Sequence, residues 1–129
     1  MSEVEPRLVV ERYVAEVLGG GDPASAAELI ANPALRRHAD SFRAAFPDAR
    51  VETRQVLTEG DLVAVHLTGH GRHLGVFQGC PPTGREWTAP CTAIYRTHSG
   101  RIANGWINWD WLAVMEQLGC IQRVETVSA

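Results

Sequence analysis

The chain has 129 residues, 45% hydrophobic and 21% charged, which is typical of a single folded domain spanning residues 1–129. Its formal net charge of −3 offers no basic face for a nucleic acid, so no nucleic-acid partner is expected. No apolar run approaches the roughly 20 residues that cross a bilayer, and Met1–Pro6 is acidic where a signal peptide is basic, so we expect a cytoplasmic protein without a membrane partner.

The first predicted element is an amphipathic helix. Its apolar residues recur at helical spacing and form one stripe: Val10, Tyr13, Val14, Val17 and Leu18. Three glycines, Gly19-Gly20-Gly21, follow the stripe directly. Because glycine readily adopts the left-handed conformation that closes a helix, they predict where this helix ends.

Two more helices are predicted from their starting residues. Asp22 can cap the second helix and Pro23 fits its first turn, and Asn32 with Pro33 repeats this signature for the third. The third helix has its own stripe: Leu35, His38, Ala39, Phe42, Ala45 and Phe46. The spacing therefore places His38 among apolar residues.

After Pro47 the period changes from helical to alternating, which predicts a β-hairpin around the turn Glu59–Asp61. One face of the first strand carries Val51, Thr53, Gln55 and Leu57, and one face of the second carries Val63, Val65 and Leu67. The stretch Gly69–Thr88 contains many glycines and two prolines, so we expect its backbone to leave regular strand geometry.

The last third of the chain predicts a second hairpin and a helix. Strands Trp87–Arg96 and Arg101–Trp109 flank the turn His98–Gly100. Asp110 can cap a final helix, Trp111–Leu118, with a frayed tail over 120–129. Three helices, a mainly antiparallel sheet and a terminal helix indicate an α+β domain.

The chain contains three cysteines: Cys80, Cys91 and Cys120. They are far apart in the sequence and odd in number, a pattern that fits neither a disulfide framework nor a paired zinc motif. We therefore expect three reduced thiols and no metal site.

The segment 71–85 carries the residues that resemble a known family. Gly71-Arg72-His73-Leu74-Gly75-Val76-Phe77 precedes Gly79-Cys80-Pro81-Pro82-Thr83-Gly84-Arg85. This is similar to the G-x-H-x-G-x-F-x-G-x-P-P-T-G-R segment of the SnoaL-like polyketide cyclases. Further similar positions occur in the family's order, so the resemblance covers roughly residues 8–119: Phe46–Asp48, Glu59–Asp61, Gly100–Ile102, Trp106 and Asp110.

The resemblance implies a cone-shaped α+β barrel of the nuclear-transport-factor-2-like (NTF2-like) superfamily, often dimeric, with one pocket per subunit and neither metal nor organic cofactor. The best-known members close a ring by an intramolecular aldol reaction, using an acidic residue as general acid and base. Relatives include cofactor-independent hydroxylases, epoxide hydrolases and steroid isomerases. We therefore expect a homodimer that binds a small hydrophobic or aromatic ligand without a cofactor.

The chain departs from the family at the catalytic acid. The final strand of the cyclases commonly reads H-W-D-x-x-D, with the first aspartate in the pocket. Aligned on Trp106 and Asp110, that position is Ile107, and isoleucine cannot transfer a proton. The resemblance therefore carries the fold further than the aldol chemistry.

Three other residues are candidates for proton transfer. Asp110, shielded by Trp109 and Trp111, can have a raised pKa suited to acid/base work, although a helix cap is the favoured interpretation. His73 matches the family's histidine and can act on a substrate oxygen or hold the loop by a structural hydrogen bond. His38 is a base if it faces the cavity, and a satisfied core histidine otherwise.

Ligand contacts are predicted from the aromatic second half of the chain. Aromatic rings there suit stacking on a flat polycyclic ligand or packing in a core, and we expect some of each. His66 and His70 share one side of a strand, and with His73 they lack a matching carboxylate or cysteine set for a metal. The predicted substrate-binding residues are Trp106, Asn108, His66, Trp87, Phe77 and Tyr95.

Three functions remain open at this stage. The leading hypothesis is an enzyme of secondary metabolism that closes a ring in an aromatic or polycyclic substrate by cofactor-independent acid/base chemistry. One alternative is a cofactor-free hydroxylase or epoxide-opening hydrolase of the same fold. The other is a non-catalytic small-molecule-binding protein, which Ile107 favours and the histidines oppose.

Overall fold

The computed structural model describes residues 5–22 and 24–122. Its elements follow the predicted order of helices, strands and terminal helix, which confirms the α+β class. They are α1 (Pro6–Tyr13), the π-helix η1 (Val14–Leu18), α2 (Ala24–Leu29), α3 (Pro33–Ala45), β1 (Arg50–Glu59), β2 (Leu62–Arg72), β3 (Glu86–His98), β4 (Arg101–Trp109) and α4 (Trp111–Leu118). No helix among these residues is both long and apolar enough to cross a membrane.

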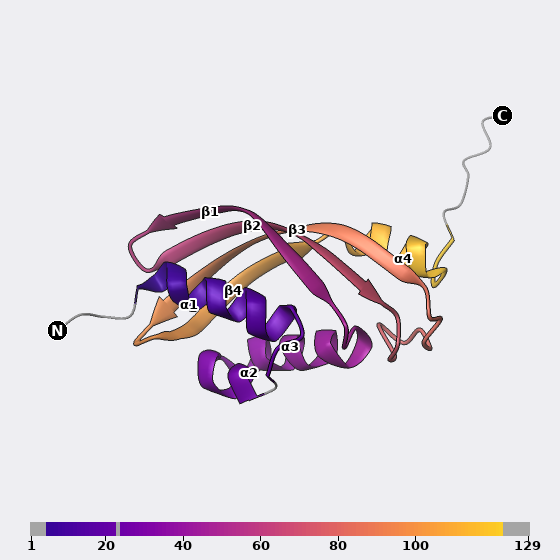
Figure 1. Ribbon diagram of the computed structural model, residues 1–129, viewed down its shortest axis with the longest axis horizontal. Coiled ribbons are helices and arrows are strands. Elements are labelled where there is room, and N and C mark those ends of the chain that lie inside the picture. Colours follow the sequence, from indigo (N-terminus) through magenta and orange to yellow (C-terminus); the bar gives the residue numbers. More distant parts are fainter. Residues whose placement is uncertain (1–4, 23, 123–129) are drawn as a thin grey trace.

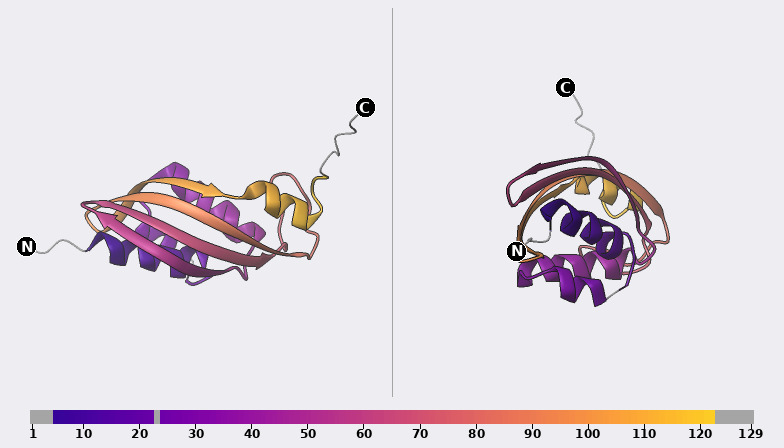
Figure 2. Two further views of the ribbon diagram at one scale, coloured as in Figure 1. Left: turned by 90° about the horizontal axis from the view of Figure 1, so that it is seen from above. Right: turned by 60° about the vertical axis from the view of Figure 1, so that its left-hand side comes forward.

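The four strands form one antiparallel sheet in the order β1-β2-β3-β4. The sheet arches over α1, and α2 and α3 lie below α1 (Figure 1). Seen from the end, it curls around α1 and gives the molecule a cone-like section, while α4 continues from the far end of β4 (Figure 2). This is the cone-shaped α+β architecture that the motif implied.

The predicted helix caps are confirmed where the structure describes them. The Asn32 side chain accepts hydrogen bonds from the amides of Ala34 and Leu35. Asp22 accepts one from the Ala24 amide, whereas Pro23 lies outside the described residues. These caps satisfy amide groups that have no partner inside their helices, so each helix starts where its capping side chain stands.

The predicted face of β1 is wrong beyond its first residues. A bulge between Thr53 and Gln55 shifts the register, because pairing changes from Thr53 with Leu67 to Gln55 with His66. One extra residue moves the following side chains to the opposite face. Val51 and Val56 are therefore the half-buried residues of β1, while Leu57 is 72% exposed.

The expected bend after Thr68 is also wrong, because β2 continues to Arg72. Two of its glycines make room for tryptophan rings instead. A Cβ atom on Gly69 would lie 2.6 Å from the Trp109 ring, and one on Gly71 would lie 2.7 Å from Trp87 Nε1. The irregular connection begins only at His73.

Aromatic side chains fill the space between sheet and helices. Phe46, which is 1% exposed, has ring-centroid distances of 4.9 to 6.2 Å to Trp87, Phe77, Phe42 and His73. Phe46 ends the predicted stripe of α3, so this stripe faces the aromatic core as expected. This core packs against the concave side of the sheet and does not cover the outer side.

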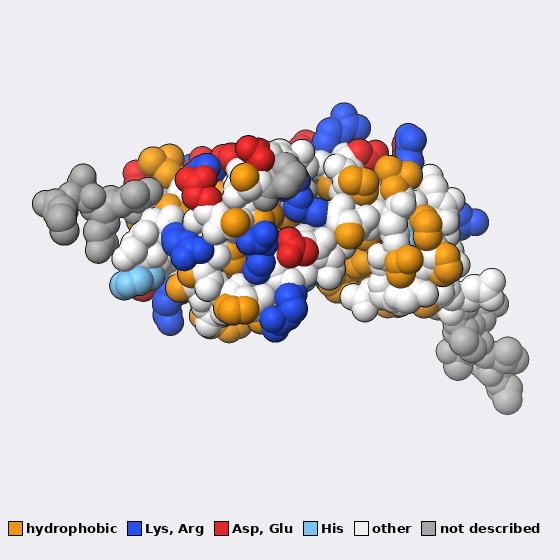
Figure 3. All heavy atoms as spheres, turned by 90° about the horizontal axis from the view of Figure 1, so that it is seen from below, with side chains coloured by type: hydrophobic (Ala, Val, Ile, Leu, Met, Phe, Trp, Pro, Cys, Tyr) orange, Lys and Arg blue, Asp and Glu red, His pale blue; other side chains and the backbone are white. Residues whose placement is uncertain are grey.

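Seen from below, the helical side of the molecule has two kinds of surface. Charged side chains of both signs are scattered over the part below α2 and α3, whereas the end that holds the 73–85 loop shows hydrophobic and uncharged groups (Figure 3). Leu74 and Val76 of this loop are 48% and 63% exposed. The loop therefore forms a distinct, weakly charged end of the molecule.

Candidate functional site

A cavity of about 890 Å³ lies where the end of η1 meets β1, β2, β3 and α4. Its volume falls in the range of small-molecule sites. Polar and apolar groups contribute about equally to its lining. Several lining residues carry hydrogen-bonding or charged side chains: Arg50, Glu52, His70, Arg72, Thr88 and Gln117.

A carboxylate, an imidazole and a hydroxyl form a chain of hydrogen bonds in this cavity. Glu52 Oε1 lies 2.8 Å from His70 Nε2, and the other ring nitrogen, Nδ1, bonds the hydroxyl of Thr88. The side chains of His70 and Glu52 are 36% and 54% exposed, so a ligand can reach them. A base oriented by a carboxylate and linked to a hydroxyl is an arrangement that enzymes use to move protons.

Strand register brings these three residues together. His70 pairs with Thr88 across β2 and β3, and Glu52 pairs with Thr68, two residues before His70. On β2 the buried side chains include Val65 and Leu67, so alternate residues such as His70 point to the outer side of the sheet. All three functional side chains therefore lie on one outer face.

The hydrogen bonds define the tautomer of His70. An ionised carboxylate can only accept a hydrogen bond, so Nε2 carries the proton that is donated to Glu52. The neutral ring then has its lone pair on Nδ1, where the Thr88 hydroxyl donates to it. Nδ1 is thus the basic atom, and Thr88 can pass a proton between a ligand and the ring.

Other groups around the cavity support this chain of hydrogen bonds. Arg50 pairs directly with His70 across the sheet and forms no ion pair within the described residues, so its charge is available to an anionic oxygen. Gln117 of α4 accepts a hydrogen bond from the Thr88 amide and donates one to the Thr88 carbonyl, both at 2.8 Å. Gln117 therefore fixes the backbone that carries the Thr88 hydroxyl.

His73 lies elsewhere, fully buried at the start of the loop. Its Nδ1 accepts a hydrogen bond from the Thr83 amide at 3.1 Å and lies 3.0 Å from Thr83 Oγ1. Its own amide donates to the Arg85 carbonyl, and its carbonyl accepts from the Gly84 amide. These contacts confirm the structural interpretation of this histidine, and a catalytic role for it stays a prediction.

Asp110 is exposed and caps α4, accepting a hydrogen bond from the Ala113 amide at 3.1 Å. The favoured interpretation of this residue is confirmed. His38 is half-buried on α3, and its Nε2 has no hydrogen-bond partner among the described residues. Burial lowers the pKa of His38, which keeps the ring neutral near neutral pH. Proton transfer by either residue stays a prediction.

The predicted ligand contacts are spread over both faces of the sheet. Phe77, Trp87 and Tyr95 belong to the core, and of these only Trp87 also lines the cavity. His66, Trp106 and Asn108 are exposed on the outer face, away from the cavity lining. Their roles in ligand binding stay predictions.

Ile107 lies on the inner side of the sheet. It pairs with the buried Ala93 and packs half-buried against the core. An aspartate here would point to the inner side of the sheet, where the resemblance implied a pocket for the family. In this chain that position carries no proton-transfer group, and the side chains of Glu52, His70 and Thr88 lie on the other side of the sheet.

Sequence reasoning missed Glu52, Thr88 and Arg50, and it grouped His70 only with His66 and His73. None of the three stands in a recognisable motif. Cross-strand partners of a histidine are the available signal, but they can be found only when the register of both hairpins is known.

The expectation of three reduced thiols is wrong for two of the cysteines. Cys80 and Cys120 form a disulfide, with Cα atoms 5.9 Å apart. Their separation of 40 residues hid this pairing in the sequence, because only folding brings the loop next to the end of α4. Cys91 is a free, buried thiol, and burial raises its pKa to about 12.

A family model and several solved structures are similar to this chain. The family model described as "SnoaL-like polyketide cyclase" matches residues 7–118. No curated protein sequence matches the chain. Among solved structures, TsrD from Streptomyces laurentii is 23% identical with a TM-score of 0.74, covering 89% of this chain and 95% of its own.

Two further structures carry functional names. IdmH from Streptomyces antibioticus, named as a candidate polyketide cyclase, is 26% identical with a TM-score of 0.69 and covers 90% of this chain and 99% of its own. AclR from Streptomyces galilaeus, named as a candidate hydroxylase, is 20% identical with a TM-score of 0.76 and covers 96% and 87%. Since the family model spans most of the chain, this protein belongs to the SnoaL-like polyketide cyclase family.

Proposed function

We propose that this protein is an enzyme of secondary metabolism that closes a ring in an aromatic or polycyclic substrate by cofactor-independent acid/base chemistry. The observation that carries the proposal is the chain of hydrogen bonds Glu52–His70–Thr88 in a cavity large enough for such a ligand. Membership of the SnoaL-like polyketide cyclase family supports ring closure as the class of reaction. A cytoplasmic location is part of the same proposal.

The proposed reaction starts with proton removal by His70. Nδ1 takes a proton, directly or through the Thr88 hydroxyl, from a carbon next to a substrate carbonyl. Glu52 stabilises the imidazolium that forms, and Arg50 faces the developing enolate oxygen. The enolate carbon then attacks a second carbonyl of the same molecule, and the imidazolium returns the proton to the new alkoxide. No atoms are gained or lost.

The cavity lining suits a substrate with several oxygen atoms. Arginine side chains and the Thr88 hydroxyl can bind carbonyl or phenolic oxygens, while Val51, Ala15 and Trp87 provide apolar contacts for ring carbons. A polyketide-derived ring system combines both features. This supports a polycyclic or aromatic substrate over a purely aliphatic one.

A hydroxylating or epoxide-opening enzyme is the second candidate. The same His70 base can activate a water molecule that opens an epoxide. A hydroxylation is an oxidation and also needs molecular oxygen as co-substrate, and it is supported by the name of the fold neighbour AclR as a hydroxylase. A non-catalytic binding protein remains the third candidate, because the inner acid position is Ile107. Turnover separates it from the first two.

The first experiment is a thermal-shift panel with polycyclic ketones, anthraquinones, steroids, epoxides and linear acyl esters. A ligand present at about a hundred times its Kd adds about 2.7 kcal/mol of stability, which raises Tm measurably. We expect polycyclic ketones or anthraquinones to shift Tm selectively, and the shift to be smaller in an Arg50→Ala variant. Selective stabilisation by linear esters alone would contradict the proposed substrate class.

We also propose that the protein is a homodimer that associates through the outer face of the sheet. One cross-strand row there is apolar and continuous: Leu57, Ala64, Ile94 and Trp106. Ile94 and Trp106 are 43% and 47% exposed. A row of this kind can pack against its own copy about a twofold axis and remove these side chains from water.

Sedimentation velocity tests the dimer. The unmodified protein should sediment as a dimer and Ile94→Lys as a monomer, because a buried lysine charge without a partner opposes association. Leu112→Lys, on the exposed side of α4, is the matched control and should stay dimeric. A monomeric unmodified protein at micromolar concentration would refute the proposal.

A further inference from the structure

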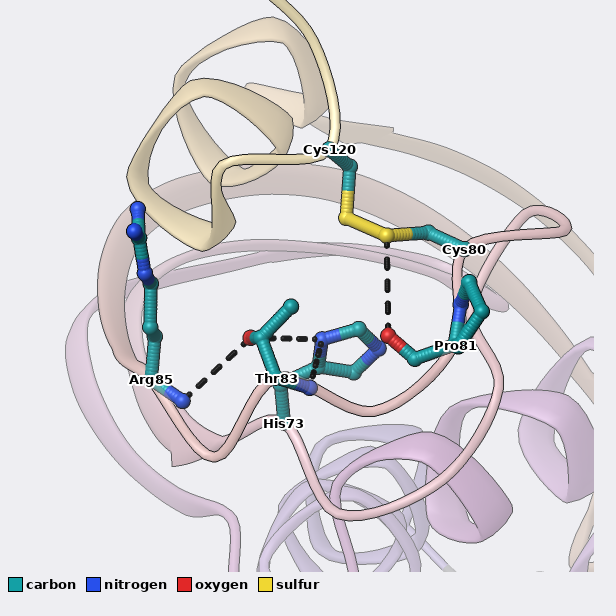
Figure 4. The surroundings of a disulfide bond; sticks show 6 residues. All are labelled: His73, Cys80, Pro81, Thr83, Arg85 and Cys120. Carbon is teal, nitrogen blue, oxygen red and sulfur yellow. Dashed lines mark hydrogen bonds between the residues drawn. A yellow bond between two sulfur atoms is a disulfide. The ribbon is translucent and has the colours of Figure 1, made fainter.

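The disulfide lies against the buried ring of His73. One ligand atom from each of His73, Cys80 and Cys120 can be chosen so that all three lie within 4.8 Å of one another. In Figure 4 Pro81 lies beside the edge of the ring that faces away from Thr83 Oγ1, and the disulfide lies above the ring. Two sulfur atoms and an imidazole therefore lie close together, although Cys120 is far from the other two residues in the sequence.

The imidazole of His73 has one coordinating atom without a partner among the described residues. His73 is 0% exposed, and its Nε2 has no hydrogen-bond partner among the described residues. A buried polar atom without a partner costs free energy, so native proteins rarely keep one without a reason. Meanwhile Nδ1 is held by Thr83, which fixes the ring with Nε2 pointing away from that contact.

We propose that, once the disulfide is reduced, Cys80, Cys120 and His73 bind a zinc ion. Two thiolates and one imidazole nitrogen are a ligand set that Zn²⁺ accepts, with water completing a tetrahedral site. Zinc ligands at about 2.1 to 2.3 Å from the metal lie nearly 4 Å from one another. The imidazole already lies within 4.8 Å of both sulfur atoms, whereas the two sulfur atoms, bonded at 2.21 Å, must move apart after reduction to admit the metal. The loop and the end of α4 are thus joined by a covalent bond in one state and by a metal in the other.

The two steps balance in electrons and protons. A dithiol reductant supplies two electrons and two protons, the S–S bond breaks, two thiols form, and the reductant becomes a disulfide. Zinc then displaces both thiol protons to solvent. The imidazole stays neutral: its proton occupies Nδ1, where Thr83 Oγ1 accepts it at 3.0 Å, at the expense of the hydrogen bond from the Thr83 amide.

The site is distinct from the 890 Å³ cavity, since none of its three ligands lines that cavity. Its function would be to hold the 73–85 loop onto α4 when the thiols are reduced. Gln117 on the same helix positions Thr88, so a firmly held α4 also supports the proposed catalytic groups. Reduced thiols are the normal state in a reducing cytoplasm.

Metal titration of the reduced protein tests the proposal. Protein reduced with a phosphine and freed of reductant under argon is titrated with Co²⁺, and then with Zn²⁺ as competitor. We expect one Co²⁺ per chain, with thiolate charge-transfer absorption and the intense d–d bands of tetrahedral cobalt, displaced by one equivalent of Zn²⁺. Protein with the disulfide intact should show neither absorption.

Variants assign the ligands. Cys120→Ser and His73→Gln should each weaken binding on the order of a hundredfold or more. Cys91→Ala is the control, because its buried thiol has a pKa of about 12 and lies outside the cluster. Circular dichroism verifies folding, and Cys120→Ser decides the matter if His73→Gln does not fold. Reduced protein that binds no metal, or Cys120→Ser that binds as the unmodified protein does, would overturn the proposal.

Discussion

His70→Gln should lower kcat on an identified substrate by roughly 10²- to 10⁴-fold while changing the ligand Kd little. General acid/base groups contribute about this much to catalysis. Glutamine retains polar contacts to the neighbours of His70 but cannot exchange a proton near neutral pH. The measurement is steady-state turnover together with ligand Kd from calorimetry, on the substrate that the thermal-shift panel nominates.

Two other variants complete this test. Glu52→Gln should reduce kcat by less than His70→Gln, because it weakens the orientation of the ring without removing the base. His98→Gln, at the exposed end of β3, should match the unmodified enzyme. Full turnover by His70→Gln would show that another group is the base, and His38 would be the next residue to replace.

Phe46→Ala should lower the free energy of unfolding by about 3 to 5 kcal/mol. Phe46 is 1% exposed and touches rings from α3, the loop and β3, so its removal leaves a cavity that neighbouring rings cannot fill without moving. A loss of this size is a large fraction of the stability of a typical domain. Urea denaturation followed by tryptophan fluorescence measures it.

Leu112→Ala is the matched control for Phe46. Leu112 is apolar but 57% exposed and lies outside the proposed dimer face, so truncating it should change stability by no more than about 0.5 kcal/mol. Phe46→Leu should fall between the two, because leucine keeps part of the buried volume. Equal effects of Phe46→Ala and Leu112→Ala would mean that the aromatic cluster contributes little to folding.

The 71–85 motif identifies the family, but it does not contain the proposed acid/base groups. His73, Thr83 and Arg85 are joined by hydrogen bonds that close the loop, and Phe77 packs on Phe46. These residues therefore maintain the fold. The motif identified the family correctly, but the acid/base groups with the best geometry lie outside it.

The elements and the core were determined by the sequence itself. Helical spacing, caps such as Asn32 and Asp110, and strict alternation in β3 are local signals, because each depends on residues within a few positions of one another. They located the helices and strands of the described chain to within a few residues, except that they predicted one continuous helix where α1 is followed by the π-helix η1. The buried faces of α1, α3 and β2 followed from the same periodicities.

The site was decided only by tertiary structure. From the turn, β1 and β2 pair Gln55 with His66, and continuing that register would place Glu52 opposite Gly69, on the inner face. The bulge at Thr53/Gln55 shifts the register by one residue, so Glu52 pairs with Thr68 and shares the outer face with His70. No local sequence pattern predicts this bulge, because its position depends on how the whole sheet bends around α1.

The pairing of the cysteines was also decided only by tertiary structure. Cys80 and Cys120 meet beside His73 because the loop folds back onto the end of α4, a contact across 40 residues. Short-range periodicity carries no information about such contacts, whereas packing of the loop against the aromatic core imposes them. Local signals therefore determined which elements form, and long-range packing decided which of their side chains act together.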